Sequence, residues 1–177
     1  MILEMKYRNE DDKCYGVTGM VLGLSVFDAN DLFTSVSIDG EDNSCISFTP
    51  DFYFSGNPRL SAKDSWQCLY SHYQISMGLV ISNVLCRKML LDRGVLDGKT
   101  RKALLDVLSD EGKETCQLER DEVEQVFDKT YSYLMRIFSN SGLAKAIRQF
   151  AERLKEKRTL SNGEALDLLD ELNIKFG

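Results

Sequence analysis

The chain lacks the residues on which several specialised classes of protein depend. It has two prolines and one histidine among 177 residues, while aromatic residues make up 10% of it. So few prolines with so many aromatic residues argue against a disordered or low-complexity chain. A single histidine excludes zinc motifs that need two histidines on one helix, such as HExxH. We therefore expect an ordinary folded chain without a standard metal motif.

The cysteines lack the arrangement of a disulfide framework or of a zinc site. Their number is odd and no pair forms CxxC; they are Cys14, Cys45, Cys68, Cys86 and Cys116. Cysteines used in this way are typical of small buried side chains in a reducing compartment. The first residues also lack the basic, apolar and small-residue order of a secretory signal. We expect a cytoplasmic protein.

The chain also lacks a long hydrophobic run. Residues 65–86 carry no formal charge, but their first half is polar and only residues 75–86 are densely apolar. About 20 apolar residues are needed to cross a bilayer, so this shorter run is typical of a buried helix. We expect no membrane partner.

Charge of both signs is plentiful but unevenly distributed. The chain has 22 basic and 28 acidic residues and a formal net charge of −6. Residues 1–64 hold 5 basic and 11 acidic residues, which gives −6, and residues 65–177 hold 17 of each. The whole net charge therefore lies in the N-terminal third, where the hydrophobic pattern also differs from the rest.

The N-terminal third predicts an antiparallel β-meander of three or four strands. Short apolar runs are separated by segments of turn-forming residues, which include a hairpin loop at 39–43. Connections this short favour antiparallel strands, because a parallel crossover needs about a dozen residues or more. The apolar runs from which these three or four strands are expected to form are 3–7, 15–27, 32–38, 45–49 and 52–54.

The rest of the chain predicts about five helices. Ser161 and Glu164 form a capping box that opens the last of them. Apolar residues recur at helical spacing in the others, which are expected at 65–93, 100–109, 119–139 and 143–157.

The helix over 65–93 is the expected packing hub. It is apolar on two sides, so we expect it to be buried between the sheet and the other helices, and to end at Gly94 in the left-handed conformation. The fold class is therefore α+β. We expect a single domain over 1–177, with a β-rich acidic portion at 1–58 and a helical portion at 59–177.

A polar strip along the same helix is the candidate site. It contains Cys68, His72, Ser76, Asn83 and Arg87, which share one side of the helix. Buried polar groups need hydrogen-bond partners, and a ligand can supply them. We treat these five residues as a candidate ligand site. The alternative is that the strip meets water or neighbouring backbone.

Cys68 and His72 stand four residues apart and can act together. They can form a thiolate–imidazole dyad or supply two metal ligands. A zinc site would need two more ligands from Cys86 or distant carboxylates, and no GxSxG elbow supports a serine triad on His72. Core packing beside a satisfied histidine is the alternative. We expect no metal and no cofactor.

Two glycine-containing segments only partly match phosphate-binding loops. Residues 94–100 have three residues between their glycines where a P-loop has four, and a helix precedes them, so we expect a helix–loop–helix connection. Gly16, Gly19 and Gly23 lie in a strand-like run, where bulges or close packing explain them. Small residues on the long helix indicate close approach of another backbone, and a ligand groove is the alternative; they are Ser71, Gly78 and Ser82.

One helix carries a basic face. We do not expect nucleic acid as a partner, because the acidic sheet would oppose its approach. We expect this face to be solvated or paired with the acidic third of the same chain. Its cations are Lys145, Arg148, Arg153, Lys155, Lys157 and Arg158.

The sequence contains no complete catalytic constellation. We therefore expect a small cytoplasmic binding or interaction module rather than an enzyme, with an aromatic segment at 48–54 as one apolar surface and a homodimer as one form. The alternative is a small-molecule binder or enzyme that uses the polar strip of Cys68, His72, Ser76, Asn83 and Arg87.

Overall fold

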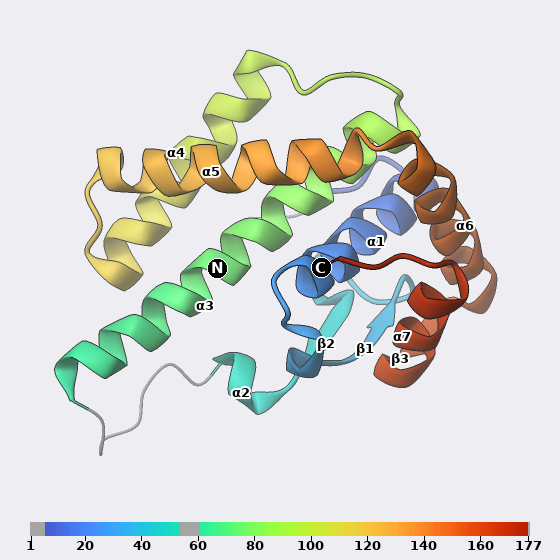
Figure 1. Ribbon diagram of the computed structural model, residues 1–177, viewed down its shortest axis with the longest axis horizontal. Helices are drawn as coiled ribbons and strands as arrows, with labels where there is room; N and C mark the ends of the chain where they lie inside the picture. The colour runs from blue at the N-terminus through green and yellow to red at the C-terminus, as the bar shows by residue number, and fades with distance from the viewer. Residues whose placement is uncertain (1–5, 54–60, 177) are drawn as a thin grey trace.

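The computed structural model describes residues 6–53 and 61–176, which form a mostly helical fold with one small antiparallel sheet (Figure 1). A mixed fold with an antiparallel sheet is therefore confirmed, although the order of its elements differs from the expected one. The elements are α1 Glu10–Val26, β1 Phe33–Ser37, β2 Ile46–Phe48, α2 Pro50–Tyr53, α3 Ala62–Leu85, α4 Gly98–Cys116, α5 Arg120–Phe138, α6 Ser141–Lys157, β3 Thr159–Ser161 and α7 Asn162–Glu171.

The sheet joins the two ends of the chain. Its strand order is β2–β1–β3, and both pairings are antiparallel. β1 and β2 form the expected hairpin, with Val36 opposite Ile46, whereas β3 places Leu160 opposite Val36 from the other side. The prediction of an N-terminal meander of three or four strands is therefore wrong. Residues 52–53 belong to α2, and the predicted strand positions 3–5 and 54 lie outside the described residues.

The largest difference from the sequence prediction is α1, which occupies most of the predicted strand 15–27. Asn9 Oδ1 accepts a hydrogen bond from the Asp12 amide at 2.9 Å and so caps the helix. The first turn is acidic, which suits the positive end of the helix dipole. Buried residues surround α1 on every side, so the alternation of apolar and polar residues that marks a surface helix is missing.

Glycines let α1 and α3 approach closely. A Cβ at Gly19 would clash with the Ser82 carbonyl oxygen and lie 2.7 Å from Cys86 Cβ. One at Gly78 would clash with the ring of Phe27. The predicted close packing is therefore confirmed at Ser82, against α1, and at Gly78, against the side chain that follows α1, whereas the third position, Ser71, is exposed.

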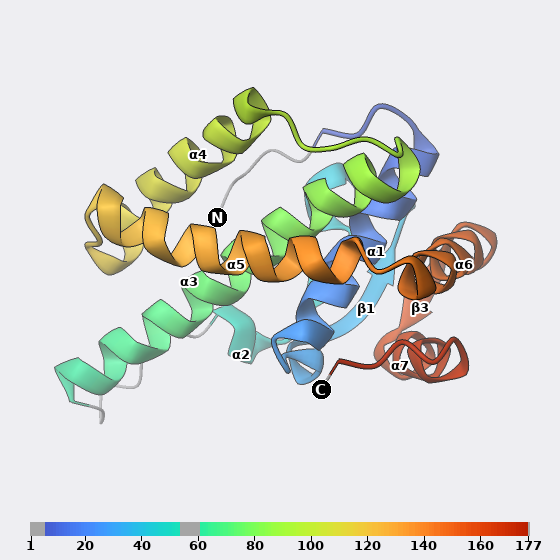
Figure 2. The ribbon, with the colours of Figure 1, turned by 45° about the horizontal axis from the view of Figure 1, so that its top comes forward.

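The hub is shared by two helices. α3 packs on α1, α4 and α5. In both views α1 lies between α3 and the sheet (Figures 1 and 2). The expectation that α3 itself lies against the sheet is therefore wrong, because α1 takes that place.

α3 continues into a π-helical segment, η3 Cys86–Leu91. The left-handed residue after it is Arg93, with φ of 53°, and not Gly94 as predicted. Asp97 Oδ1 then accepts a hydrogen bond from the Thr100 amide at 2.6 Å and caps α4. Residues 94–100 thus form the predicted helix–loop–helix connection.

The C-terminal helices follow the predicted pattern closely. α5 and α6 match their predicted ranges within two residues, and α4 runs beyond the predicted end at 109 to Cys116. Ser161 and Glu164 form the predicted capping box of α7. Within the described residues no helix is long and apolar enough to cross a membrane.

Candidate functional site

The five residues of the predicted polar strip separate into two places along α3 and η3. Cys68 and His72 lie near the N-terminal half of α3, and Ser76 is buried in the core at 2% exposure. Asn83 and Arg87 belong to a network of polar side chains at the other end. At 1.5 Å of rise per residue, His72 and Asn83 are about 16 Å apart along the helix. One compact ligand cannot contact all five residues.

Cys68 and His72 line a groove between α2 and α3, which we call the α2–α3 groove. Its volume is about 490 Å³, within the roughly 300–1,000 Å³ typical of ligand pockets. Its described walls contain Leu32, Asp51, Phe52, Asp64, Gln67, Cys68, Ser71, His72 and Ile75.

Aromatic packing positions His72 on the groove wall. The Phe52 ring meets the imidazole edge-on at 4.6 Å and stacks on Phe48 at 3.8 Å. The aromatic segment 48–54 therefore turns Phe52 inward, at 8% exposure, and leaves Tyr53 67% exposed. Phe54 lies outside the described residues. The aromatic surface predicted for this segment thus contributes Phe52 to a wall of the groove.

The imidazole of His72 is held in its neutral form. Burial lowers the pKa of His72 below its ordinary value of 6.5. Its Nε2 is buried and has no hydrogen-bond partner among the described residues. The described residues therefore leave this nitrogen without a hydrogen bond, whereas the packing alternative would require one from protein atoms. A hydrogen bond to Nε2 from a ligand, after a small rotation of the ring, would recover some of the cost of burial.

Cys68 is the accessible thiol of the chain. All five cysteines are free; Cys68 is exposed and the other four are buried. Burial raises the pKa of the Cys14 and Cys45 thiols to about 11, which keeps them protonated and unreactive. Reagents that attack thiols should therefore react with Cys68 faster than with the four buried cysteines.

Charge in the α2–α3 groove has one sign. Asp51 and Asp64 are its formally charged described residues, and both are carboxylates. Asp64 accepts a hydrogen bond from Ser61 Oγ at 2.6 Å, and no cationic side chain pairs with either carboxylate in the described chain. With His72 neutral, the described wall carries about −2 at neutral pH. A cationic ligand is favoured there.

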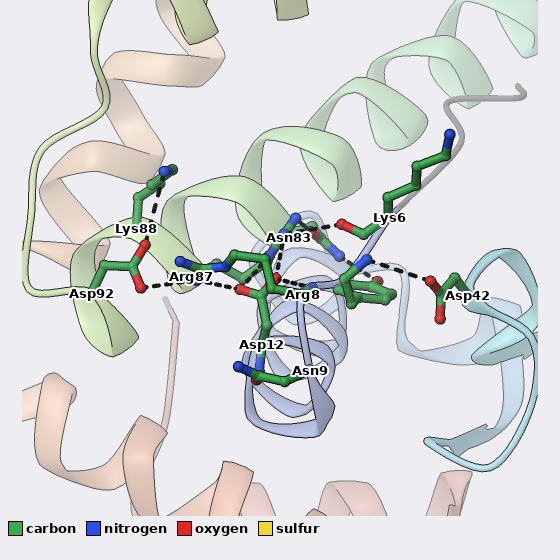
Figure 3. Close-up of polar contacts among 10 residues, drawn as sticks. Lys6, Arg8, Asn9, Asp12, Asp42, Asn83, Arg87, Lys88 and Asp92 are labelled. Carbon is green, nitrogen blue, oxygen red and sulfur yellow. Dashed lines mark hydrogen bonds and ion pairs between the residues drawn. The ribbon is translucent and has the colours of Figure 1, made fainter.

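Asn83 and Arg87 belong to a second polar group, the Asp12 cluster, drawn in Figure 3. The Asp12 carboxylate is fully buried, and Arg87 donates to it from Nε at 2.9 Å and from Nη2 at 2.5 Å. Arg8 donates to the same carboxylate from Nη2 at 2.7 Å and from its amide at 2.9 Å. This bidentate arrangement connects the start of α1 to η3, the segment that continues α3.

Further bonds surround the Asp12 cluster. Asn83 Nδ2 donates to Tyr7 Oη at 2.8 Å, and the Arg87 guanidinium lies 5.0 Å from the centre of the Tyr7 ring. Arg8 also donates to Asp92 Oδ1 at 2.8 Å. Each charge in the cluster thus faces an opposite charge or an aromatic ring, as expected for a cluster that stabilises the fold.

The pKa of Asp12 reflects this balance. Burial alone would raise it, but the hydrogen bonds from Arg87 and Arg8 together outweigh burial and hold the pKa well below its usual range. The carboxylate is therefore charged at every physiological pH and does not exchange protons there. Its role is to hold two cations, and not to act as an acid or base.

The sequence singled out Arg87 and Asn83 but missed the residues that complete both groups. Asp12 lies 75 residues from Arg87 in the chain, and no local pattern joins them. Asp51 and Phe52 belong to α2, which the sequence predicted as a strand. The cap at Asn9 followed by three acidic residues was the available signal for α1, and it would have placed Asp12 in a first turn.

No group of three or more histidine, cysteine, aspartate or glutamate side chains in the described chain is arranged to hold a metal ion. Cys68 and His72 share the groove, but Cys86 is fully buried in the core between α1 and α3. The zinc set considered from the sequence is therefore not assembled.

The C-terminal part of the basic stretch on and after α6 is paired with carboxylates of the same chain. Lys155 Nζ lies 2.7 Å from Asp11 Oδ1, and Arg158 lies 2.6 Å from Asp39 and 3.1 Å from Glu10. The predicted pairing between this basic stretch and the acidic third is therefore present.

Comparison with known proteins adds no relative. No family model, no curated protein and no solved structure matches the chain.

Proposed function

We propose that the protein is a binding module that holds a basic, apolar segment of a partner protein in the α2–α3 groove. The observation that supports this most directly is the composition of the groove: apolar walls, two carboxylates and a neutral histidine, with no cationic side chain among its described lining residues. A lysine or arginine of the partner would face Asp51 and Asp64. An apolar neighbour would lie on Phe52 and Ile75.

The groove gives less support to catalysis. Cys68 and His72 are a nucleophile and a base in type, but no carboxylate in the described chain bonds to His72 to orient it. Five free thiols are consistent with the reducing cytoplasm, where we place the protein. A small cationic molecule or a second copy of the chain are the alternative occupants.

Cys68 provides a direct test. A peptide of alternating lysine and leucine is added, and the rate at which iodoacetamide alkylates Cys68 is measured by mass spectrometry. The same peptide with glutamate in place of lysine is the matched probe. We expect the lysine peptide to slow alkylation at least tenfold at saturation and the glutamate peptide to leave the rate unchanged. Equal rates with and without the lysine peptide would overturn the proposal.

A plugged groove is the control. Ser71→Trp fills the groove from an exposed position, so we expect it to abolish the protection by the lysine peptide. Ser132→Trp, at an exposed position on α5, is expected to leave it unchanged. Light scattering without peptide shows whether a second copy occupies the groove. A dimer that Ser71→Trp dissociates would assign the groove to self-association and not to a basic partner.

A further inference from the structure

A second groove lies between the C-terminal end of α5, the start of α6 and the segment that follows α7. Its volume is about 580 Å³. Ile137, Leu143, Leu172 and Phe176 are half-buried there and form an apolar floor. Arg136 and Lys175 are exposed at its border, so it is an open trough and not an enclosed cavity. We call it the α5–α6 groove.

The cations of the α5–α6 groove differ from those of the neighbouring helix face. Lys155, Lys157 and Arg158 each have a carboxylate partner. Arg136 and Lys175 have none within residues 6–53 and 61–176, and the Arg136 guanidinium lies 5.6 Å from the centre of the Tyr133 ring. No acidic side chain is among the described residues that line this groove.

The start of α6 adds to the positive potential. Asn140 Oδ1 accepts hydrogen bonds from the amides of Gly142 at 3.0 Å and Leu143 at 3.2 Å. The cap is a neutral amide and the first turn of α6 contains no acidic residue, so neither offsets the partial positive charge of this helix end. Two unpaired cations beside this helix end favour an anionic ligand with an apolar portion.

We propose that the α5–α6 groove binds an acidic, apolar segment of a partner protein. Carboxylates of the segment pair with Arg136 and Lys175, and its apolar side chains lie on Leu143 and Phe176. The open shape suits a segment of chain better than a small molecule, because exposed border residues would leave a small ligand largely in water. This site is separate from the α2–α3 groove, and it prefers the opposite charge.

The test uses two labelled peptides that differ only in charge. One is a fluorescein-labelled 14-residue peptide of glutamate and leucine at helical spacing, and the other has lysine in place of every glutamate. Fluorescence anisotropy measures binding to the full chain. We expect the acidic peptide to bind at least tenfold more tightly in 50 mM salt, with an affinity that falls as salt is raised.

Charge reversals locate the site. Two variants reverse the charge of exposed groove residues: Arg136→Glu and Lys175→Glu. We expect each to leave the melting temperature nearly unchanged and to weaken binding of the acidic peptide at least tenfold. The control variants are Lys129→Glu and Lys145→Glu, which reverse exposed cations of the same two helices outside the groove. They should weaken binding of the acidic peptide less than threefold. Ser71→Trp should have no effect, which separates this site from the α2–α3 groove.

Three results would overturn the proposal. The first is no binding of the acidic peptide up to millimolar protein. The second is an equal loss in the groove and control variants, which would indicate general charge attraction. The third is binding of decanoate at Arg136 and Lys175 without binding of the peptide, which would assign the groove to a small amphipathic acid.

Discussion

At the scale of single residues, the buried Asp12 carboxylate depends strongly on the side chains around it. It is fully buried and receives charged hydrogen bonds from two arginines. A buried ion pair adds little net stability when complete, because desolvation offsets the attraction between the charges. Removing one member of the pair lowers the free energy of unfolding strongly, because the other charge stays buried without a partner.

The substitution Asp12→Asn tests how much stability is lost when one member of this buried ion pair is removed. It leaves the Arg87 side chain, which is 17% exposed, without its charged partner, and we expect the free energy of unfolding to fall by about 3–5 kcal/mol. Urea denaturation followed by circular dichroism measures the loss. Asp11→Asn removes the neighbouring carboxylate, whose pair with Lys155 is exposed, and should cost much less. Similar losses in the two variants would contradict the assignment.

His72 predicts a dependence on pH. Its pKa is lowered by burial in the folded protein, so the unfolded chain takes up a proton first as pH falls. The wild-type protein should therefore lose stability relative to His72→Gln as pH is lowered through about 6.5, and the two should run parallel above about pH 7.5. Denaturation midpoints between pH 5 and 8 test this. A constant difference over this range would show that His72 does not titrate abnormally.

The residues of the two polar groups on α3 and η3 also show how much of the candidate site the sequence could predict. Cys68 and His72 were found because they lie on one helix, where a spacing of four residues places them on one face. Arg87 was found for the same reason, but it serves a different place in the fold. Asp12 and Phe52 could not be found, since their partners are joined to them only by tertiary packing.

At the scale of elements, α1 shows how burial hides a helix. Its residues are apolar on all sides and include three glycines that face α3. Valine, glycine and leucine in such a run are equally compatible with a buried strand when the helical period is absent. By contrast, α5 and α6 are buried on one side only, and the sequence predicted both.

The glycines of α1 predict a sharp effect of one methyl group. Gly19→Ala places a Cβ against the Ser82 backbone carbonyl, which cannot move without shifting α3, so we expect a loss of about 1–3 kcal/mol. Gly163→Ala in α7 meets no atom within 4 Å and its φ is not positive. We expect this control to stabilise the protein by about 0.5–1 kcal/mol. Thermal or urea unfolding of both variants provides the test.

At the scale of the whole molecule, the separation of charge along the sequence is matched by proximity in space. The acidic start of α1 and the hairpin loop lie against the basic end of α6. The net charge of residues 1–64 is therefore partly compensated by residues far along the chain. The sequence alone suggested such pairing but not which residues form the pairs.

A double variant measures this compensation. Lys155→Gln with Arg158→Gln removes both cations, and we expect a modest fall in melting temperature at 50 mM salt, because the pairs are exposed. The difference from wild type should vanish near 1 M salt, where the Debye length is about 3 Å. Lys102→Gln with Lys113→Gln, at exposed positions of α4, is the control. A loss that persists at high salt would indicate packing and not charge.

The position of β3 has a consequence for synthesis of the protein. β1 forms the middle of the sheet, but one of its neighbours, residues 159–161, leaves the ribosome long after β1 and β2 have done so. Until then one edge of β1 has no strand beside it, and an open edge is a template for pairing with other chains. Nascent or prematurely terminated chains that stop before Thr159 should therefore depend on chaperones, and their aggregates should involve β1.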